Sequence, residues 1–120
     1  MVLVDTSVWV DHFRVGNERL SQLLDEGLVL THPFVIGELA LGNIENRREI
    51  LDLLGRLPQS VAASDNDVLT TIEGRKLWGK GIGLVDAHLL ASSLLSNAQL
   101  FTLDKRLAAF APSLLRDARS

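Results

Sequence analysis

Short apolar runs alternate with stretches of helical periodicity along this chain. Val2–Val4 is a continuous apolar run with two β-branched residues, typical of a strand that is buried on both faces. Residues 28–30 and 100–103 are similar runs, and helical patterns separate the three. Strands joined by helical crossovers lie parallel to one another. The sequence therefore predicts a three-layer α/β/α fold around a short, mostly parallel central sheet.

Capping residues, glycines and prolines mark where the helices begin and end. Thr6 or Ser7 can cap a helix that reaches Phe13, and Asn17 can cap a second one that is closed by Gly27. Further helices are predicted over residues 33–41, 50–57, 84–96 and 105–111, and from residue 64 onward with residues 68, 69, 72 and 77 on its apolar face. Two weaker strands are predicted at residues 61–63 and 114–115.

Four acidic residues stand at conspicuous places in this pattern. Asp5 directly follows the first predicted strand, and Asp104 directly follows the run at 100–103. Ligands of open α/β sheets bind at the carboxyl ends of the strands, so these two acids meet if their strands are neighbours. Glu38 and Asp86 are each the only charge in an otherwise apolar helix. A carboxylate in such surroundings needs a partner if it is buried.

Each acid also has an ordinary structural explanation. Asp5 and Asp104 could cap the helix that follows them, and Asp86 could complement the dipole of its helix from the first turn. Glu38 could lie on a narrow solvent-facing strip. The functional interpretation therefore rests on the four acids occurring together.

Four carboxylates in one place repel one another unless a cation neutralises them. The chain has no cysteine and no HxxxH pair, so an all-oxygen site favours Mg²⁺ or Mn²⁺ over zinc. Mg²⁺ usually keeps several waters and takes one or two protein carboxylates, which leaves room for a substrate phosphate. No GxSxG or P-loop offers a competing arrangement. The pattern predicts hydrolysis of a phosphate ester by metal-activated water.

The composition is that of one globular domain, residues 1–120. With 47% hydrophobic and 22% charged residues the chain can bury a core, and the lack of cysteine excludes disulfide scaffolds. The first residues do not form a secretory signal, and no apolar stretch is long enough to span a membrane. We therefore expect a soluble, cytoplasmic protein.

The net charge of −3 argues against a protein that coats nucleic acid. The four candidate acids account for that sign, because the remaining 11 acidic residues face 12 basic ones. Tight nonspecific binding of nucleic acid through a broad basic face stays excluded, and any binding of nucleic acid would depend on a metal and on a few local cations.

Four blocks of this sequence, in this order and spacing, resemble those of a known family. They are MVLVDTSVWVDHFR, HPFVIGELALGN, GIGLVDAHLLAS and FTLDKRL. Each contains one of the four acids, and together they extend over nearly the whole chain. They closely resemble the PIN-domain ribonucleases, and specifically the VapC toxins of type II toxin–antitoxin systems.

The resemblance implies a PIN fold and Mg²⁺-dependent endonucleolytic cleavage of structured RNA, transfer or ribosomal, with Mn²⁺ able to substitute. Carried over by position, it implies that Asp5 and Asp86 are the principal metal ligands and that Asp104 holds metal directly or through water. Glu38 would orient the attacking water or a second ion. The family often places hydroxyls beside these acids, and Ser7 and Thr102 fit by position.

Several basic residues are candidates for contacts with RNA phosphates, although a helix dipole also explains some of them. The candidates are Arg75, Lys76, Lys80, Lys105 and Arg106. We expect Trp9 and Trp78 to be core or interface anchors rather than base-stacking platforms. The resemblance also implies a cognate VapB antitoxin that places an arginine among the acids, and a homodimer.

Two other classes of protein share parts of this pattern. A phosphorelay receiver domain has a similar length, layout and Mg²⁺ site, but it needs an acidic pair after the first strand, where this chain has only Asp5. It also needs a phosphorylatable aspartate ending a central strand, whereas Asp52 lies inside a predicted helix. A catalytically silent module could use the same acids to bind a protein partner.

Overall fold

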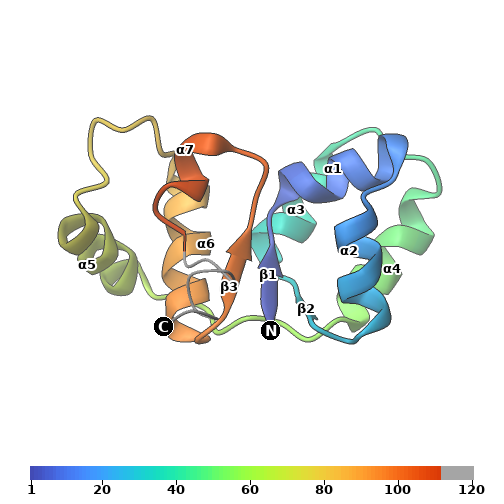
Figure 1. Ribbon diagram of the computed structural model, residues 1–120, viewed down its shortest axis with the longest axis horizontal. Helices are drawn as coiled ribbons and strands as arrows, with labels where there is room; N and C mark the ends of the chain where they lie inside the picture. Colours follow the sequence, from blue (N-terminus) through green and yellow to red (C-terminus); the bar gives the residue numbers. More distant parts are fainter. Residues whose placement is uncertain (112–120) are drawn as a thin grey trace.

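A three-stranded parallel sheet lies at the centre of the protein (Figure 1), in a computed structural model that describes residues 1–111. In spatial order the strands are β2 (Val29–Leu30), β1 (Val2–Val4) and β3 (Gln99–Phe101). β1 is central, and Leu3 lies opposite Leu30 on one side and Leu100 on the other. The predicted short parallel sheet is confirmed.

Helices cover both sides of this sheet. They are α1 (Thr6–Val15), α2 (Glu18–Asp25), α3 (Pro33–Leu41), α4 (Arg47–Arg56), α5 (Asp65–Arg75), α6 (Leu84–Leu95) and α7 (Lys105–Ala108). In Figure 1, α1 to α4 gather on one side of the strands and α5 to α7 on the other. This arrangement explains why β1 is apolar at every position, since both of its faces pack against helices.

Several capping predictions are confirmed by hydrogen bonds. Asn17 Oδ1 accepts from the backbone N–H of Leu20 at 2.9 Å, which caps α2. Ser64 and Asp67 form a reciprocal capping box at the start of α5, with distances of 3.1 and 2.9 Å. The prediction for α1 was wrong, because this helix already begins at Thr6 and Asp5 occupies its cap position.

The ends of some elements differ from the prediction. β3 ends at Phe101 rather than at residue 103, and α7 ends three residues earlier than residue 111. Residues 61–63 do not form a strand; instead Gln59 makes an isolated parallel bridge to Thr31 at the edge of β2. The weak strand predicted at residues 114–115 lies outside the described residues.

Two large apolar side chains of α5 and of the loop that follows it lie at the surface. Trp9 is 4% exposed and belongs to the core, as predicted, but Trp78 is 58% exposed. On α5, Val68 is buried whereas Leu69 is 60% exposed, so the apolar face of this helix is narrower than its sequence indicates. No helix among residues 1–111 has the length and apolar character to cross a membrane.

The central strand is expected to dominate stability. Leu3 is fully buried, so Leu3→Ala should lower the free energy of unfolding by about 2–5 kcal/mol through lost burial and an unfilled cavity. Leu41 is 90% exposed, and Leu41→Ala should change it by less than about 0.5 kcal/mol. Urea denaturation followed by circular dichroism measures both. Equal destabilisation by the two substitutions would contradict this assignment of the core.

Candidate active site

Two hydroxyl groups hold the carboxylate of Asp5 at the end of β1. Asp5 is only 5% exposed. Its Oδ2 accepts a hydrogen bond from Ser7 Oγ at 2.7 Å, in the first turn of α1, and one from Thr102 Oγ1 at 2.8 Å, just after β3. Asp5 makes no side-chain hydrogen bond that caps α1. Capping therefore does not explain its place, and its oxygen is oriented by groups from two different segments.

The backbone after β3 fixes the direction of these hydrogen bonds. Ser7 Oγ accepts from the N–H of Leu103 at 3.0 Å, and Thr102 Oγ1 accepts from the N–H of Asp104 at 3.0 Å. Each hydroxyl has a single proton, which it donates to Asp5. The 3.4 Å approach of Ser7 Oγ to Thr102 Oγ1 then leaves no proton for a bond between them. The predicted site hydroxyls thus lie against Asp5 and tie it to the segment that carries Asp104.

Glu38 reaches the same end of the molecule from α3. Its side chain is exposed, and its Oε1 accepts a hydrogen bond from Thr6 Oγ1 at 2.8 Å. Thr6 was not among the predicted site residues. The signal that could have found it is its place directly after Asp5 at the start of α1, a helix that packs against α3.

A hollow of about 670 Å³ opens beside Glu38, and it was not predicted either. Thr6 and Glu38 form part of its wall, so it borders one of the four acids. Its other polar lining residues are a cation, a second acid and two amides: Arg14, Glu45, Asn43 and Asn46. Polar groups of these kinds can contact the phosphates and base edges of a nucleic acid.

Asp104 has the structural role that the capping explanation anticipates. Its Oδ1 accepts from the backbone N–H of Arg106 at 2.9 Å and of Leu107 at 3.4 Å, which caps α7. Capping occupies one of its two carboxylate oxygens, so a second role for Asp104 remains chemically open.

The negative charges of the other three acids affect the pKa of Asp86. It lies in the first turn of α6, where its Oδ2 accepts from the N–H of Gly83 at 3.4 Å. Burial raises the pKa of Asp86, and the negative charge of Asp5 raises this pKa further, with smaller contributions from Asp104 and Glu38. The bond from Gly83 opposes the shift only in part. The fold therefore gathers the four predicted acids into one region of shared negative potential.

The oxygen donors in this region suit a hard divalent cation. Among residues 1–111, no three acidic or histidine side chains are placed as a ready-made metal-binding group. Mg²⁺ needs only one or two carboxylates, because water and substrate phosphate complete its coordination. A buried carboxylate, Asp5, close to other acids that raise the pKa of Asp86 is chemically matched to such an ion.

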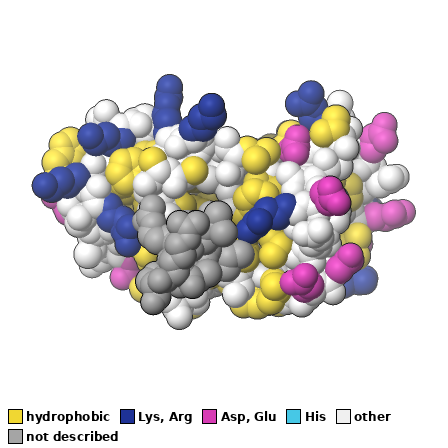
Figure 2. Space-filling view, viewed as in Figure 1, with side chains coloured by type: hydrophobic (Ala, Val, Ile, Leu, Met, Phe, Trp, Pro, Cys, Tyr) yellow, Lys and Arg dark blue, Asp and Glu magenta, His cyan; other side chains and the backbone are white. Residues whose placement is uncertain are grey.

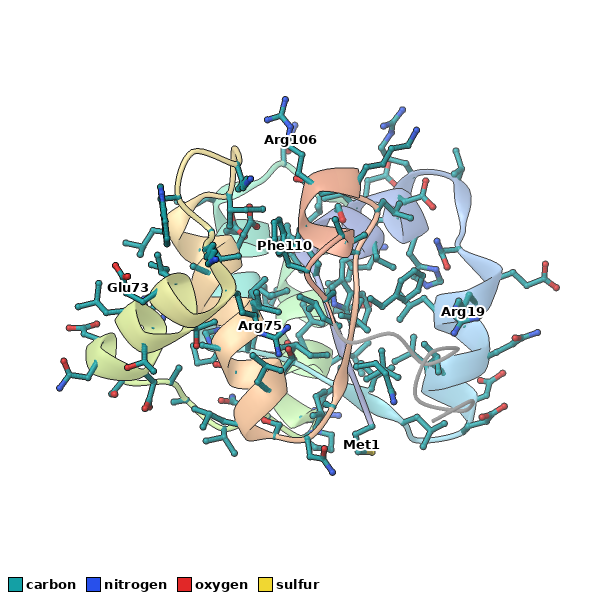
Figure 3. The ribbon with its side chains drawn as sticks, turned by 60° about the vertical axis from the view of Figure 1, so that its left-hand side comes forward. Met1, Arg19, Glu73, Arg75, Arg106 and Phe110 are labelled. Atoms are coloured by element: carbon teal, nitrogen blue, oxygen red, sulfur yellow. The ribbon has the colours of Figure 1, made fainter. Side chains whose placement is uncertain are left out.

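The candidate RNA-binding cations are spread over two places. Arg75 ends α5, Lys76 follows it as the C-cap, and Lys80 lies in the loop before α6. Lys105 and Arg106 begin α7. Figure 3 shows Arg106 at the end of the molecule and Arg75 well away from it, so the five residues do not form one cluster.

Arg106 nevertheless lies against the loop that carries Lys80. A Cβ atom added to Gly81 would come within 2.8 Å of the Arg106 guanidinium nitrogen Nη1. Gly81 has a φ of +77°, a conformation that L side chains rarely adopt. Glycine at this position therefore lets the Arg106 guanidinium lie close to the loop that leads into α6.

Known proteins with similar sequences support the family assignment. The profile of the PIN domain matches residues 2–111. Ribonuclease VapC32 of Mycobacterium tuberculosis, from strains CDC 1551 and H37Rv, is 49% identical over 110 residues. The match covers 91% of this chain and 89% of that protein.

Solved structures share the fold at lower sequence identity. The crystal structure of FitAcB from Neisseria gonorrhoeae has a TM-score of 0.64 with 21% identity, and the match covers 92% of each chain. PAE2754 from Pyrobaculum aerophilum has a TM-score of 0.62 with 17% identity, covering 99% of this chain and 90% of that one. These likenesses concern the fold alone.

The family match decides against the receiver-domain alternative and agrees with the four acidic blocks from which the resemblance was inferred. The chain belongs to the PIN-domain family, and its likeness to the VapC-type members of that family is confirmed.

Proposed function

We propose that this protein is a Mg²⁺-dependent endoribonuclease and the toxin of a VapBC-type toxin–antitoxin pair. One arrangement carries most of the proposal: Ser7 and Thr102 hold the buried carboxylate of Asp5 at the end of β1, and its charge, with smaller contributions from Asp104 and Glu38, adds to burial in raising the pKa of Asp86. Carboxylates that repel one another in this way favour a divalent cation with a phosphate ester as its further ligand. Mn²⁺ also prefers oxygen ligands and can take the place of Mg²⁺.

Each acid has a distinct part in the proposed reaction. Asp5 and Asp86 would hold the ion, with Asp104 as a further ligand, direct or through water. The bound ion supplies an activated water and stabilises the leaving oxygen. Ser7 and Thr102 keep Asp5 from rotating. Glu38, itself held by Thr6, would orient the attacking water.

The proposed substrate is structured RNA, either transfer or ribosomal. Lys105 and Arg106 stand immediately after Asp104, which suits them to contact phosphates on either side of the scissile bond. Arg75, Lys76 and Lys80 would contact the RNA further away. Such contacts fix the position of a strand without reading its sequence.

We also propose a cognate antitoxin of the VapB type that inhibits by placing an arginine among the acids. A guanidinium pairs well with carboxylates and would compete with the metal for them. The homodimer implied by the family resemblance stays a prediction. A silent module that binds a partner through the same acids would show the pairing without the cleavage, so activity assays separate the two.

Loss of Asp5 should abolish cleavage while leaving the fold intact. Asp5→Asn is expected to reduce Mg²⁺-dependent cleavage by more than about 100-fold, since even groups that only support metal ligands are worth about 10–100-fold. Cleavage is measured by mapping 5′ ends in total RNA after brief induction. Asp25→Asn, an exposed acid at the end of α2, is the matched control and should remain active. Full activity in both Asp5→Asn and Asp86→Asn would disprove the mechanism.

Removing one of the hydroxyls on Asp5 should weaken catalysis without abolishing it. Thr102→Val keeps the shape of the side chain but removes its hydrogen bond to Asp5 and the one it accepts from the N–H of Asp104, so cleavage should fall by about 10–100-fold. Thr70→Val, at an exposed position on α5, controls for the loss of a hydroxyl. Equal cleavage rates for Thr102→Val and the unsubstituted protein would show that Asp5 needs no such support.

The raised pKa of Asp86 makes its charge a cost to folding. This cost is absent below the ordinary value of 3.8, where Asp86 is protonated in both states; it grows between that value and the raised folded-state pKa, and is constant above it. Asp86→Asn should therefore raise Tm at pH 7 in EDTA, and the two Tm values should converge near pH 3. Mg²⁺ should stabilise the unsubstituted protein more than the variant. A lower Tm for Asp86→Asn at pH 7 in EDTA would contradict the repulsion.

A further inference from the structure

Trp78 is a large aromatic side chain that lies outside the hydrophobic core. It lies in the loop between α5 and α6 and is 58% exposed, whereas its neighbour Leu77 is 3% exposed. Figure 1 shows this loop at the same end of the molecule as α7 and the carboxyl end of β3. An indole ring at the surface has an apolar face available for a partner.

The ring borders a shallow hollow at the start of α6, the helix that carries Asp86. The hollow has a volume of about 260 Å³ and is lined by Ile72, Leu77, Trp78, Ile82, Gly83, Leu84 and Ala87. Gly83 is also the residue whose N–H donates to Asp86 at 3.4 Å. The lining of the hollow therefore includes a residue that donates a hydrogen bond to a proposed metal ligand. Its lining is mostly apolar, which suits the flat face of a base.

The charges around Trp78 are those of a surface that binds polyanions. Residues 75–83, which include the loop that carries Trp78, contain three basic residues and no acidic one. The rest of the chain has nine basic and 15 acidic residues. Figure 2 shows most Lys and Arg side chains of that face over the α5–α7 side and most Asp and Glu side chains over the other side.

Two of the cations lie in or against the loop that carries Trp78. Lys80 is two residues beyond Trp78, and the Arg106 guanidinium lies against Gly81 in the same loop. An isologous dimer through this surface would bring the same cations of two copies together, which is unfavourable. Charge complementarity therefore favours a nucleic acid over a second copy of the chain.

We propose that Trp78 is a stacking platform for one unpaired base of the RNA substrate. Lys80 and Arg106 contact the phosphates beside that base, and the hollow directs the strand toward Asp86. The inference rests on the proposed function in taking its ligand to be the RNA that is cut. It reverses the expectation that Trp78 anchors the core or an interface.

The two tryptophans provide a direct test, because Trp9 is buried and Trp78 is exposed. The probes are 12-nucleotide oligoadenylate and oligouridylate, titrated at fixed salt with Mg²⁺ into proteins that all carry Asp5→Asn to prevent cleavage. Stacking should quench the emission of Trp78 on binding. In Trp78→Phe, where only Trp9 emits, the emission should not change.

Affinity measured by fluorescence anisotropy of labelled probes gives a second readout. Trp78→Ala should weaken binding by about 5- to 150-fold, the range expected from losing one base–aromatic stack, and Trp78→Phe should stay within about threefold. Leu69→Ala removes another exposed apolar side chain, on α5, and should leave affinity unchanged. If Trp78→Ala fails to fold, the quenching of Trp78 decides alone.

Three outcomes would overturn the proposal. They are unchanged affinity of Trp78→Ala, absence of quenching on binding, and a change of sedimentation in Trp78→Ala with RNA affinity intact, which would assign the surface to a second copy. Cleavage by the unsubstituted protein is scored separately. RNA cleavage without a contribution from Trp78 rejects only this inference, whereas binding with quenching but no cleavage at any metal concentration rejects the proposed function.

Discussion

The parallel pairing of β1 with β3 is the contact on which the site depends. The backbone N–H of Asp5 donates to the carbonyl of Phe101 at 2.9 Å, so the pairing continues one residue beyond the strand β1. This brings Thr102 within hydrogen-bond distance of a carboxylate 97 positions away in the chain. A slip of one residue in this register would turn every side chain of the segment to the opposite face. Asp5 would then lose Thr102, and Ser7 would lose its backbone donor at Leu103.

Acidic side chains of the site and several basic side chains lie at the same end of the sheet. The four acids of the site account for the net charge of −3, because without them 11 acidic residues face 12 basic ones. The cations of the segment 75–106 lie in two separate groups, residues 75–80 before α6 and Lys105 with Arg106 at the start of α7, instead of covering a broad face. In the proposed function, a bound cation removes the repulsion among the acids and lets RNA phosphates approach. Affinity for RNA would then depend on the metal and on a few local contacts.

Most of the fold follows from local sequence signals. Several predicted features involve residues that are near one another in the sequence, so they can be predicted without a structure. They are the short apolar strands, the Asn17 cap and the capping box of Ser64. The acids at strand ends were predicted to meet because parallel strands end at a common edge. In the structure the acids are near enough for their charges to raise the pKa of Asp86. Which of them bind metal stays a prediction.

Features that depend on packing between segments far apart in the chain could not be predicted from the sequence in the same way. The bond from Thr6 to Glu38 depends on how α1 lies against α3, and nothing in either segment specifies that distance. Leu69 and Trp78 are as apolar as core residues, yet both are exposed. Their exposure reflects a helix and loop packed on one side only, which hydrophobic periodicity does not reveal.

In the proposed function, Asp5 and Asp86, with Asp104, hold a divalent cation at the end of the sheet. Crystals grown with Mn²⁺ and measured by anomalous diffraction test it directly, because the anomalous signal locates the ion independently of any assay. We expect an anomalous peak at ligand distance, about 2.0–2.3 Å, from a carboxylate oxygen of Asp5 or Asp86. No peak near these acids at saturating Mn²⁺, or a peak only at other residues, would contradict it.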